Sequence, residues 1–466
     1  MRKKVLYVII VFCCLFLAAC RGDVDLNAID SDCEYLKTIF EEASIDISKT
    51  IDEGLDSAKL IEDIKAEYAR LFKKKYPEPK LNENGIDAKR FAQAINTVLF
   101  DNLTRADCHL SIYGEGFGYA PFIPYVTYFS DVFFEKSGDS YFVYSSKNKR
   151  IKPGMKYTGD EMDLYKTYVD GRELYRFGIF ANQYPARRYV NIEEKDYRVS
   201  MSIATGPVEQ EENLSYKLED KVLKIVFSSC TWKTEAEYNR LMDAMDSICK
   251  VIKEQSVELV VVDMRRNGGG AMGISQSLTA ALCGIQGGQE EDDFWNYMSY
   301  LEYGAVFINT LTTRTTNALK GHGGNSGNQY LLGKSGEKYI LFNEEYVEDF
   351  IHQITPEYKG KILLVTDWGT ASAAEDFVGF LKVIFKDDVI VVGQNTLGCL
   401  DYGNIHDFLL RNSRLKITLC QTDYTDIVML NSNIGWHGDG RGFYPDYWYC
   451  LDDDLNVDDL ILLLRE

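Results

Sequence analysis

The sequence predicts an α/β core preceded by a small helical domain and a β-rich module. Before about residue 103, apolar residues recur three and four positions apart, which is typical of helices. Residues from about 110 to 215 are rich in Tyr, Phe, Val and Thr with Gly and Pro turns, which favours strands. From about residue 218, strand-like and helix-like segments alternate. At 466 residues, the chain is long enough for two or three domains and a large core.

The first residues have the pattern of a secretory signal. A basic start, Met1–Lys4, is followed by an apolar run to Ala19 that is too short to span a bilayer comfortably. The run ends in Leu17–Cys20, which resembles the cleavage box of bacterial lipoproteins, where the cysteine is acylated. We therefore expect a lipoprotein signal over 1–19 and a lipid anchor on Cys20. The alternative is ordinary signal cleavage, which would leave Cys20 as a free thiol.

Composition excludes some classes of partner. The net charge of −20 argues against binding to nucleic acid and against adhesion to anionic lipid. The 11 cysteines form no close pair of the C-x-x-C kind, so we expect no structural zinc site. Neither a metal nor a cofactor is expected, and the oligomeric state is left open.

After Cys20 we expect a short tether and a helical domain, together covering residues 20–105. Residues 60–72 and 91–100 each keep apolar side chains on one helical face. Pro77 and Pro79 separate the two segments.

Residues 106–216 form the predicted β-rich module. Pro153–Lys156 and Asp170–Arg172 are expected turns within it. Its place in the chain suggests a peptide-binding module of the PDZ kind, and an unrelated β subdomain is the alternative.

Residues 217–466 form the predicted α/β core. A long segment, 284–360, interrupts the alternation, and we interpret it as an insertion that covers the crevice as a lid. The expected strands are 221–227, 257–263, 361–366, 389–392 and 415–420, and the expected helices are 235–253, 272–282 and 373–385.

Two segments of this core read as halves of one site. Residues 260–270 and 362–375 each consist of a buried-type strand, a turn of small residues and the start of a helix. Parallel strands that end side by side leave their turns in one crevice. One turn offers backbone N–H groups on Gly268–Gly270, and the other offers the hydroxyl of Ser372. This pairing indicates acyl transfer.

Ser372 also has a purely structural interpretation. Ser372–Glu375 fits a capping box, with the serine at the N-cap and the glutamate at N3. Small residues on both sides of Ser372 favour a nucleophile, since a bulky substrate has to reach it. A helix N-terminus would also stabilise a nearby oxyanion.

The glycines have two interpretations as well. Gly268–Gly270 could form only a tight turn where a helix packs closely on a sheet. Three glycines in succession are more than a turn requires, and they let a carbonyl oxygen approach main-chain N–H groups. The segment is not a phosphate-binding loop, because it lacks the spacing of one.

Four short blocks together resemble the core of the tail-specific (C-terminal processing) serine peptidases, in order and rough spacing over about 220–450. The blocks are 261–270, 369–375, 391–398 and 442–446. The resemblance implies a catalytic core of β/α layers like that of ClpP and crotonase. It also implies that Ser372 is the nucleophile and that the N–H of Ala373, with that of Gly269 or Gly268, forms the oxyanion hole.

The sequence departs from the best-known branch of this family where that branch has its lysine base, because Cys399 occupies the position. A hydroxyl without a base is a poor nucleophile near neutral pH. The chain is closer to the branch similar to the tricorn core peptidase, which takes a histidine from a D-x-H motif upstream. Asp107–Leu110 occupies that place, which makes His109 the expected general base.

The acid that assists His109 is less defined. In the tricorn-like arrangement a late glutamate has this role, and the residue offered here is Asp439, for which a turn aspartate is the alternative. His437 is a weaker alternative base. Because Cys108 precedes the base and Cys399 replaces the lysine, we also consider an oxidised Cys108–Cys399 pair close to Ser372.

The preferred function is that of a lipid-anchored serine endopeptidase of the bacterial cell envelope, on the periplasmic or outer-membrane face, acting on polypeptides. The alternative is a catalytically inactive lipoprotein that binds peptides or another ligand on the same fold. A glycan-binding or glycan-cleaving protein, with Trp436 and Trp448 stacking on sugar, is a poorer third interpretation.

Overall fold

The structure is a computed structural model. It describes residues 26–73, 78–103, 107–186, 188–203, 212–308, 331–332, 337–342, 354–450, 460–461 and 464. The chain divides into two compact units. Unit 1 takes residues up to 106 with 110–121 and 405–419, and unit 2 takes 107–109, 122–404 and 420 onward.

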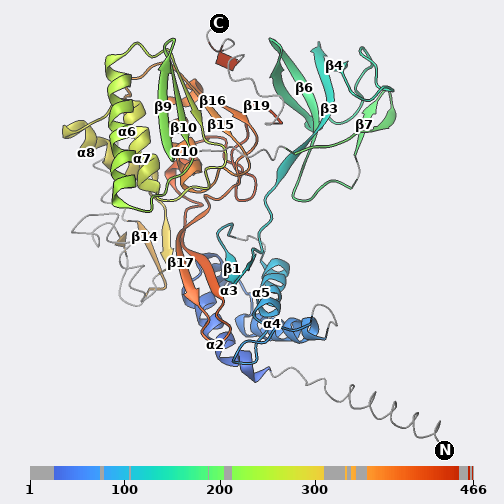
Figure 1. Cartoon of the computed structure of the whole chain (residues 1–466), viewed down its shortest axis with the longest axis vertical. Helices are drawn as coiled ribbons and strands as arrows, with labels where there is room; N and C mark the ends of the chain where they lie inside the picture. Colours follow the sequence, from blue (N-terminus) through green and yellow to red (C-terminus); the bar gives the residue numbers. More distant parts are fainter. Residues whose placement is uncertain are drawn as a thin grey trace, which may run out of the picture. The chain divides into compact units, whose positions relative to one another are not determined.

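Unit 1 contains the predicted helices. The amphipathic segments 60–72 and 91–100 lie in α4 and α5, and their apolar faces, which include Ile64 and Phe91, form its core. Asp56 and Asp87 cap the two helices by accepting hydrogen bonds from backbone N–H groups of the first turn. The helices are α2 (Asn27–Glu42), α3 (Ile45–Asp52), α4 (Ser57–Phe72) and α5 (Ala88–Asn102), drawn in blue in Figure 1.

Strand residues complete unit 1. β1 (Ser111–Gly114) pairs antiparallel with β2 (Phe117–Tyr119) and with residues 416–418 of β18 (Lys416–Asp423). The loop before β18 is held by the buried carboxylate of Asp32, which accepts hydrogen bonds from the backbone N–H groups of Asn412 and Ser413.

Unit 2 is built on a six-stranded sheet in the order β19-β16-β15-β11-β10-β9. All neighbours pair in parallel except β9, which pairs antiparallel with β10. This is the predicted α/β core. Its strands are β9 (Leu214–Glu219), β10 (Val222–Phe227), β11 (Leu259–Asp263), β15 (Lys361–Thr366), β16 (Val389–Gly393) and β19 (Tyr447–Trp448).

Alternate residues of the central strands enter two different cores. Val260 and Val262 pack against the helices, whereas Val261 packs on the opposite face with Phe129 and Trp448. Strands buried on both faces explain the continuous apolar runs in the sequence. The helices on the first face are α6 (Glu235–Glu254), α7 (Met272–Cys283) and α10 (Ala373–Phe385), with α6 and α7 side by side (Figure 1).

The predicted β-rich module is also present. Its main sheet has the order β4-β3-β6-β5, all antiparallel, and β7 and β8 form a separate pair. The expected turn at Asp170–Arg172 joins β5 to β6. Its likeness to a PDZ module stays a prediction. The strands are β3 (Val126–Ser137), β4 (Ser140–Ser145), β5 (Leu164–Val169), β6 (Arg172–Ala181), β7 (Tyr189–Ile192) and β8 (Lys195–Arg198), and the 3₁₀ helix η1 covers Glu161–Asp163.

One predicted element belongs elsewhere. Residues 415–420 do not continue the parallel β/α pattern, because β18 lies outside that sheet and pairs with β17 (Tyr402–Leu409) and, in unit 2, antiparallel with β12 (Val306–Ile308). A short alternation of apolar and polar residues does not reveal which strand is its neighbour.

The interrupting segment 284–360 is described in part, and its role as a lid stays a prediction. Its described elements are α8 (Gly288–Leu301), β12, β13 (Leu331–Leu332) and β14 (Tyr339–Phe342). The other short helices of unit 2 are η5 (Lys386–Asp388) and α11 (Val428–Asn431).

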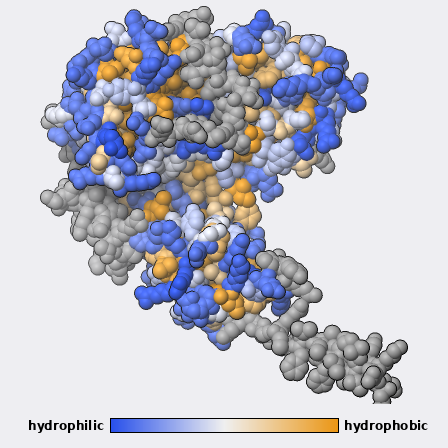
Figure 2. Space-filling view, in the orientation of Figure 1, coloured by the Kyte–Doolittle hydropathy of each residue, from blue (hydrophilic) through white to orange (hydrophobic). Residues whose placement is uncertain are grey.

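The described helices include none that is long and apolar enough to cross a membrane. The predicted signal 1–19 and Cys20 lie outside the described residues. On the face shown in Figure 2, hydrophobic residues form separate patches between hydrophilic ones.

Candidate active site

The two predicted turns lie side by side because their strands are neighbours. β11 pairs in parallel with β15, with Asp263 opposite Val365. Beyond the strands, the backbone N–H of Arg266 donates to Asp367 Oδ1 over 2.9 Å, and that of Ala371 donates to the Asn267 carbonyl over 2.9 Å. The glycine turn and the serine turn are thus fixed to each other by hydrogen bonds.

Ser372 has a backbone conformation that an ordinary N-cap does not need. Its φ is +53° and its ψ is −128°, outside the extended region that N-cap residues normally adopt. Glu375 Oε2 accepts a hydrogen bond from the Ser372 N–H over 3.0 Å, as in a capping box. A strained backbone at a serine between a strand and a helix is a feature of nucleophile turns and favours the chemical interpretation.

His109 faces this serine. Its Nε2 lies 3.1 Å from Ser372 Oγ, although 263 residues separate the two in the sequence. The sequence therefore named two residues that the structure brings within hydrogen-bond distance. Their roles as nucleophile and base stay predictions.

The acid beside His109 is Asp107. Its Oδ1 lies 3.2 Å from His109 Nδ1 and also accepts the backbone N–H of His109 over 2.8 Å. Its Oδ2 accepts the backbone N–H of Cys420 over 3.1 Å, and the residue is fully buried. Asp107 is the first residue of the D-x-H motif, and the sequence alone gave it no role. The spacing could have indicated this role, because a carboxylate two residues before a histidine can lie within hydrogen-bond distance of the ring atom Nδ1.

The residue expected to assist His109, Asp439, has other partners. Its Oδ1 accepts the backbone N–H of Asp401 over 3.0 Å, and its own N–H donates to Asp401 Oδ2 over 3.1 Å. Burial, with the nearby Asp401 carboxylate, raises the pKa of Asp439 well above its usual range. The described hydrogen bond of the His109 Nδ1 atom is therefore with Asp107, and the assisting role of Asp439 stays a prediction. His437, the weaker alternative base, stacks on Tyr444 at 3.7 Å between ring centroids.

The backbone of the two turns offers donors for an oxyanion. Ala373 is the first residue of α10, so its N–H has no acceptor within the helix. Gly269 lies against it, because a Cβ on Gly269 would come within 2.9 Å of the Ala373 nitrogen. The Gly269 N–H, however, donates to Asn267 Oδ1 over 3.0 Å. Of the two glycines expected from the sequence, Gly268 is exposed and Gly269 is buried, and the choice between their N–H groups stays a prediction.

Glu375 connects the serine turn to the segment that replaces the lysine of the best-known branch. Besides the Ser372 N–H, it accepts the backbone N–H groups of Gly398 and Cys399, each over 2.8 Å. Burial outweighs these hydrogen bonds and raises the pKa of Glu375 to about 7. The carboxyl group therefore fixes the position of residue 399 relative to the helix start.

Cys399 is joined to Cys108 by a disulfide. The oxidised pair considered from the sequence is thus present, and Cys108 Sγ lies 3.4 Å from His109 Nδ1. Cys108, His109 and Cys399 are close enough to hold a metal ion, but the disulfide occupies both sulfurs. A second close group, Asp107, His109 and Cys420, includes the hydrogen-bonded acid and base.

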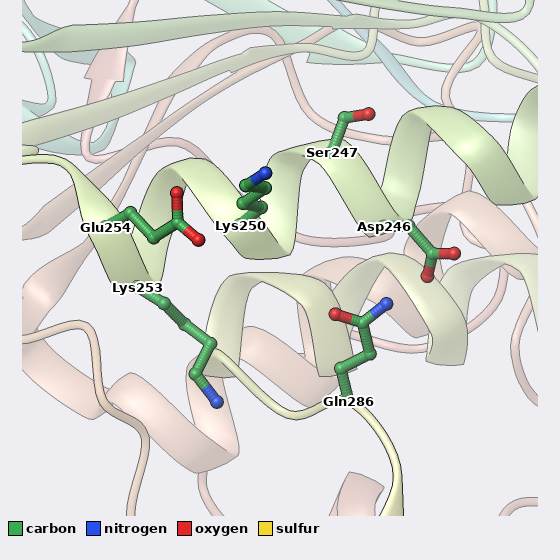
Figure 3. A pocket seen from close by; sticks show the side chains of 6 residues that line it. All are labelled: Asp246, Ser247, Lys250, Lys253, Glu254 and Gln286. Carbon is green, nitrogen blue, oxygen red and sulfur yellow. The ribbon is translucent and has the colours of Figure 1, made fainter.

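The two tryptophans considered for glycan binding make contacts within the protein. Trp448 is buried against Phe129 and Tyr165, and Trp436 Nε1 donates to Asp401 Oδ1 over 2.9 Å. A surface hollow of about 450 Å³ lies along α6, and its lining side chains do not converge on one point (Figure 3). None of the residues that line it is a candidate catalytic group: Asp246, Ser247, Lys250, Lys253, Glu254 and Gln286.

Comparison with known proteins gives one family and several distant structures. Residues 237–427 match the model of peptidase family S41. No curated protein matches the chain in sequence. Eight similar solved structures have identities of 12–14% and TM-scores of 0.30–0.41.

Three of these structures illustrate the range. A lipoprotein from Streptococcus agalactiae is 14% identical, with 55% of this chain and 70% of the other covered and a TM-score of 0.31. Mature CPAF is 13% identical, with 91% and 92% covered and a TM-score of 0.40. The photosystem II D1 C-terminal processing protease is 12% identical, with 94% and 97% covered and a TM-score of 0.37.

The family match includes Ser372, the glycine turn and Cys399, whereas His109 precedes it. The predicted resemblance to the tail-specific serine peptidases is therefore supported over residues 237–427, the segment that matches the S41 family model.

Proposed function

We propose that the protein is a serine endopeptidase in which Ser372 attacks the substrate carbonyl and His109 transfers the proton. The observation that carries the proposal is the contact of 3.1 Å between His109 Nε2 and Ser372 Oγ, made by a ring whose Nδ1 lies 3.2 Å from Asp107 Oδ1. The family match supports peptidase activity, and the hydrogen bonds support this choice of residues.

Asp107 sets the tautomer of the base. Because its carboxylate accepts the proton of Nδ1–H, the lone pair of the ring lies on Nε2, facing the hydroxyl of Ser372. Nε2 takes the proton as Oγ bonds to the carbonyl carbon. The resulting imidazolium is stabilised by the Asp107 carboxylate and returns its proton to the leaving amine.

The carbonyl oxygen becomes negatively charged in this step. The N–H of Ala373, at the positive end of α10, and the N–H of Gly268 are the donors that we assign to it. Water, deprotonated by His109, then hydrolyses the acyl-enzyme. No step requires a metal or a cofactor.

We further propose that Cys20 carries lipid and anchors the peptidase at the bacterial cell envelope, where its substrates would be polypeptides. The signal pattern before Cys20 supports the anchor, and the family supports the substrate class.

Covalent labelling with a fluorophosphonate tests the mechanism. Wild-type protein is expected to label at one serine, and Ser372→Ala is expected to abolish the label. His109→Ala should slow labelling by ~100-fold or more, because a general base typically contributes that much. His437→Ala is the matched control and should label at the wild-type rate.

The contrary outcome is also informative. Folded wild-type protein that does not label would favour the alternative, an inactive lipoprotein that binds peptides or another ligand on this fold. Equal rates for His109→Ala and wild type would remove His109 as the base.

A further inference from the structure

The segment that carries the proposed base has an unusual place in the chain. Residues 107–109 group with unit 2, which carries Ser372, whereas the described residues on both sides, 78–103 and 110–121, group with unit 1. The chain on either side of these three residues belongs to unit 1, so contacts with other residues of unit 2 have to hold them there. The position of His109 therefore depends on those contacts.

Besides the Ser372 contact, the attachments of residues 107–109 include the following two. One is the hydrogen bond from the Cys420 N–H to Asp107 Oδ2. The other is covalent, the disulfide between Cys108 and Cys399, which links positions 291 residues apart.

Cys399 is itself fixed to the nucleophile turn. Its N–H donates to Glu375 Oε2, the same oxygen that accepts the N–H of Ser372. The contacts thus form a closed ring. Glu375 links Ser372 to Cys399, and the disulfide links Cys399 to Cys108. His109, next to Cys108 in the chain, contacts Ser372 and closes the ring. Opening any one of these links leaves His109 less firmly oriented.

We propose that the disulfide between Cys108 and Cys399 holds the His109 ring in position. Reduction of this disulfide by a dithiol lowers the peptidase activity. The proposal rests on the proposed function. Cys108 and Cys399 are positioning residues, because neither sulfur is placed on the substrate.

The chemistry is thiol–disulfide exchange. A thiolate of the dithiol attacks Cys108 Sγ, which belongs to a partly exposed residue, whereas Cys399 is 4% exposed. The sulfur–sulfur bond breaks, a mixed disulfide forms, and Cys399 leaves as a thiolate that takes a proton. The second thiol of the reductant then closes a cyclic disulfide. Cys108 and Cys399 have gained two electrons and two protons, and the reductant has lost them.

The other described cysteines do not share this reactivity. They are buried and form no disulfide, and burial raises the pKa of both Cys33 and Cys230 to about 12. Among the described residues, a dithiol therefore has one disulfide to act on.

The test compares oxidised and reduced full-length protein. Thiol titration should show two additional thiols after dithiothreitol, and the fluorophosphonate labelling rate should fall ~10- to 100-fold, the usual effect of misplacing a catalytic group by about 1 Å. With a peptide substrate, kcat should fall while KM changes little. Oxidation with diamide should restore the rate.

Variants supply the controls. The double variant Cys108→Ser/Cys399→Ser should label slowly and be insensitive to dithiothreitol, whereas Cys249→Ser, a buried free thiol, should respond like wild type. Complete reduction without a change in labelling rate would overturn the proposal, as would a reduced protein that has simply unfolded by circular dichroism.

One readout separates this inference from the proposed function. In the Ser372→Ala variant, the ring signals of His109, assigned by comparison with His109→Ala, should shift on reduction because the ring is displaced. If oxidised wild type fails to label but the shift occurs, the peptidase proposal fails and the positioning role stands. If the protein labels but neither rate nor signal responds to reduction, only the positioning role fails.

Discussion

At the scale of the residue, the site depends on one short motif. Asp107 and His109 share the segment before β1, and two hydrogen bonds join them. The sequence indicated the histidine through a family resemblance, and its contact with a serine 263 residues away could not be obtained from local periodicity. The resemblance to the family pointed to Asp439, a carboxylate late in the sequence, as the assisting acid. Asp107 lies only two residues before His109, which places its carboxylate within hydrogen-bond distance of Nδ1.

The first prediction separates the two carboxylates. Asp107→Asn should lower kcat by ~100-fold or more, because an amide in this position favours the wrong tautomer of the histidine. Asp439→Asn should retain activity within ~3-fold, because Oδ1 can still accept the Asp401 N–H. Peptidase assays with thermal melts of both variants check this. The reverse order of effects would return the assisting role to Asp439.

The second prediction concerns the glycine turn. Gly269→Ala should destabilise the fold by ~2 kcal/mol or more, because φ is +85° and the new Cβ would lie 2.6 Å from the Ala371 carbonyl oxygen. Gly268→Ala is the matched control and should be nearly neutral, since its Cβ would meet no described atom within 4 Å. Urea unfolding measures both. Equal losses for the two variants would contradict this account of the turn.

At the scale of the element, most helices and core strands were predictable. The segments predicted as 361–366 and 373–385 are β15 and α10, residue for residue. Strong periodicity and the capping pattern at Ser372–Glu375 explain this accuracy. The sequence assigned β18 to the wrong sheet, because its alternation of apolar and polar residues fits a parallel and an antiparallel sheet equally well. Its pairing partners, β1 and β12, are also far from it in the sequence.

The cap of α10 gives the third prediction. Since burial raises the pKa of Glu375 from 4.5 to about 7, the native state binds its proton more tightly than the unfolded state does. Its contribution to stability is therefore full below about pH 4.5 and is lost as the pH rises through about 7. The loss is on the order of 3 kcal/mol.

Urea unfolding of wild type and Glu375→Gln between about pH 5 and pH 8 provides the measurement. The variant does not titrate at this position, so the stability advantage of wild type should shrink as the pH rises. A difference that stays constant over this range would show that Glu375 does not titrate there.

At the scale of the whole molecule, the site depends on chain segments that are far apart in sequence. The proposed base lies in residues 107–109 and the proposed nucleophile is residue 372, yet both belong to unit 2. Composition and periodicity indicated three kinds of architecture in order along the chain. Composition and periodicity could not show that residues 107–109, which lie between two segments of unit 1, group with unit 2. That grouping depends on contacts between residues far apart in the sequence.

The fourth prediction concerns location. Cys20→Ser should move the protein from the detergent phase to the aqueous phase in detergent phase separation, because a lipidated cysteine is the proposed anchor. Cys33→Ser, which removes a buried free thiol, should stay with the detergent. Wild-type protein found in the aqueous phase would argue for ordinary signal cleavage.

The burial of cysteines outside the disulfide has a consequence for biosynthesis. Six described cysteines are buried and form no disulfide: Cys33, Cys230, Cys249, Cys283, Cys420 and Cys450. While the chain is still unfolded, nothing protects these thiols from oxidants, and each could cross-link with a wrong partner. The protein should therefore fold correctly when its interior packs faster than these thiols are oxidised. The yield of correctly folded protein then depends on the redox potential of the compartment in which it folds.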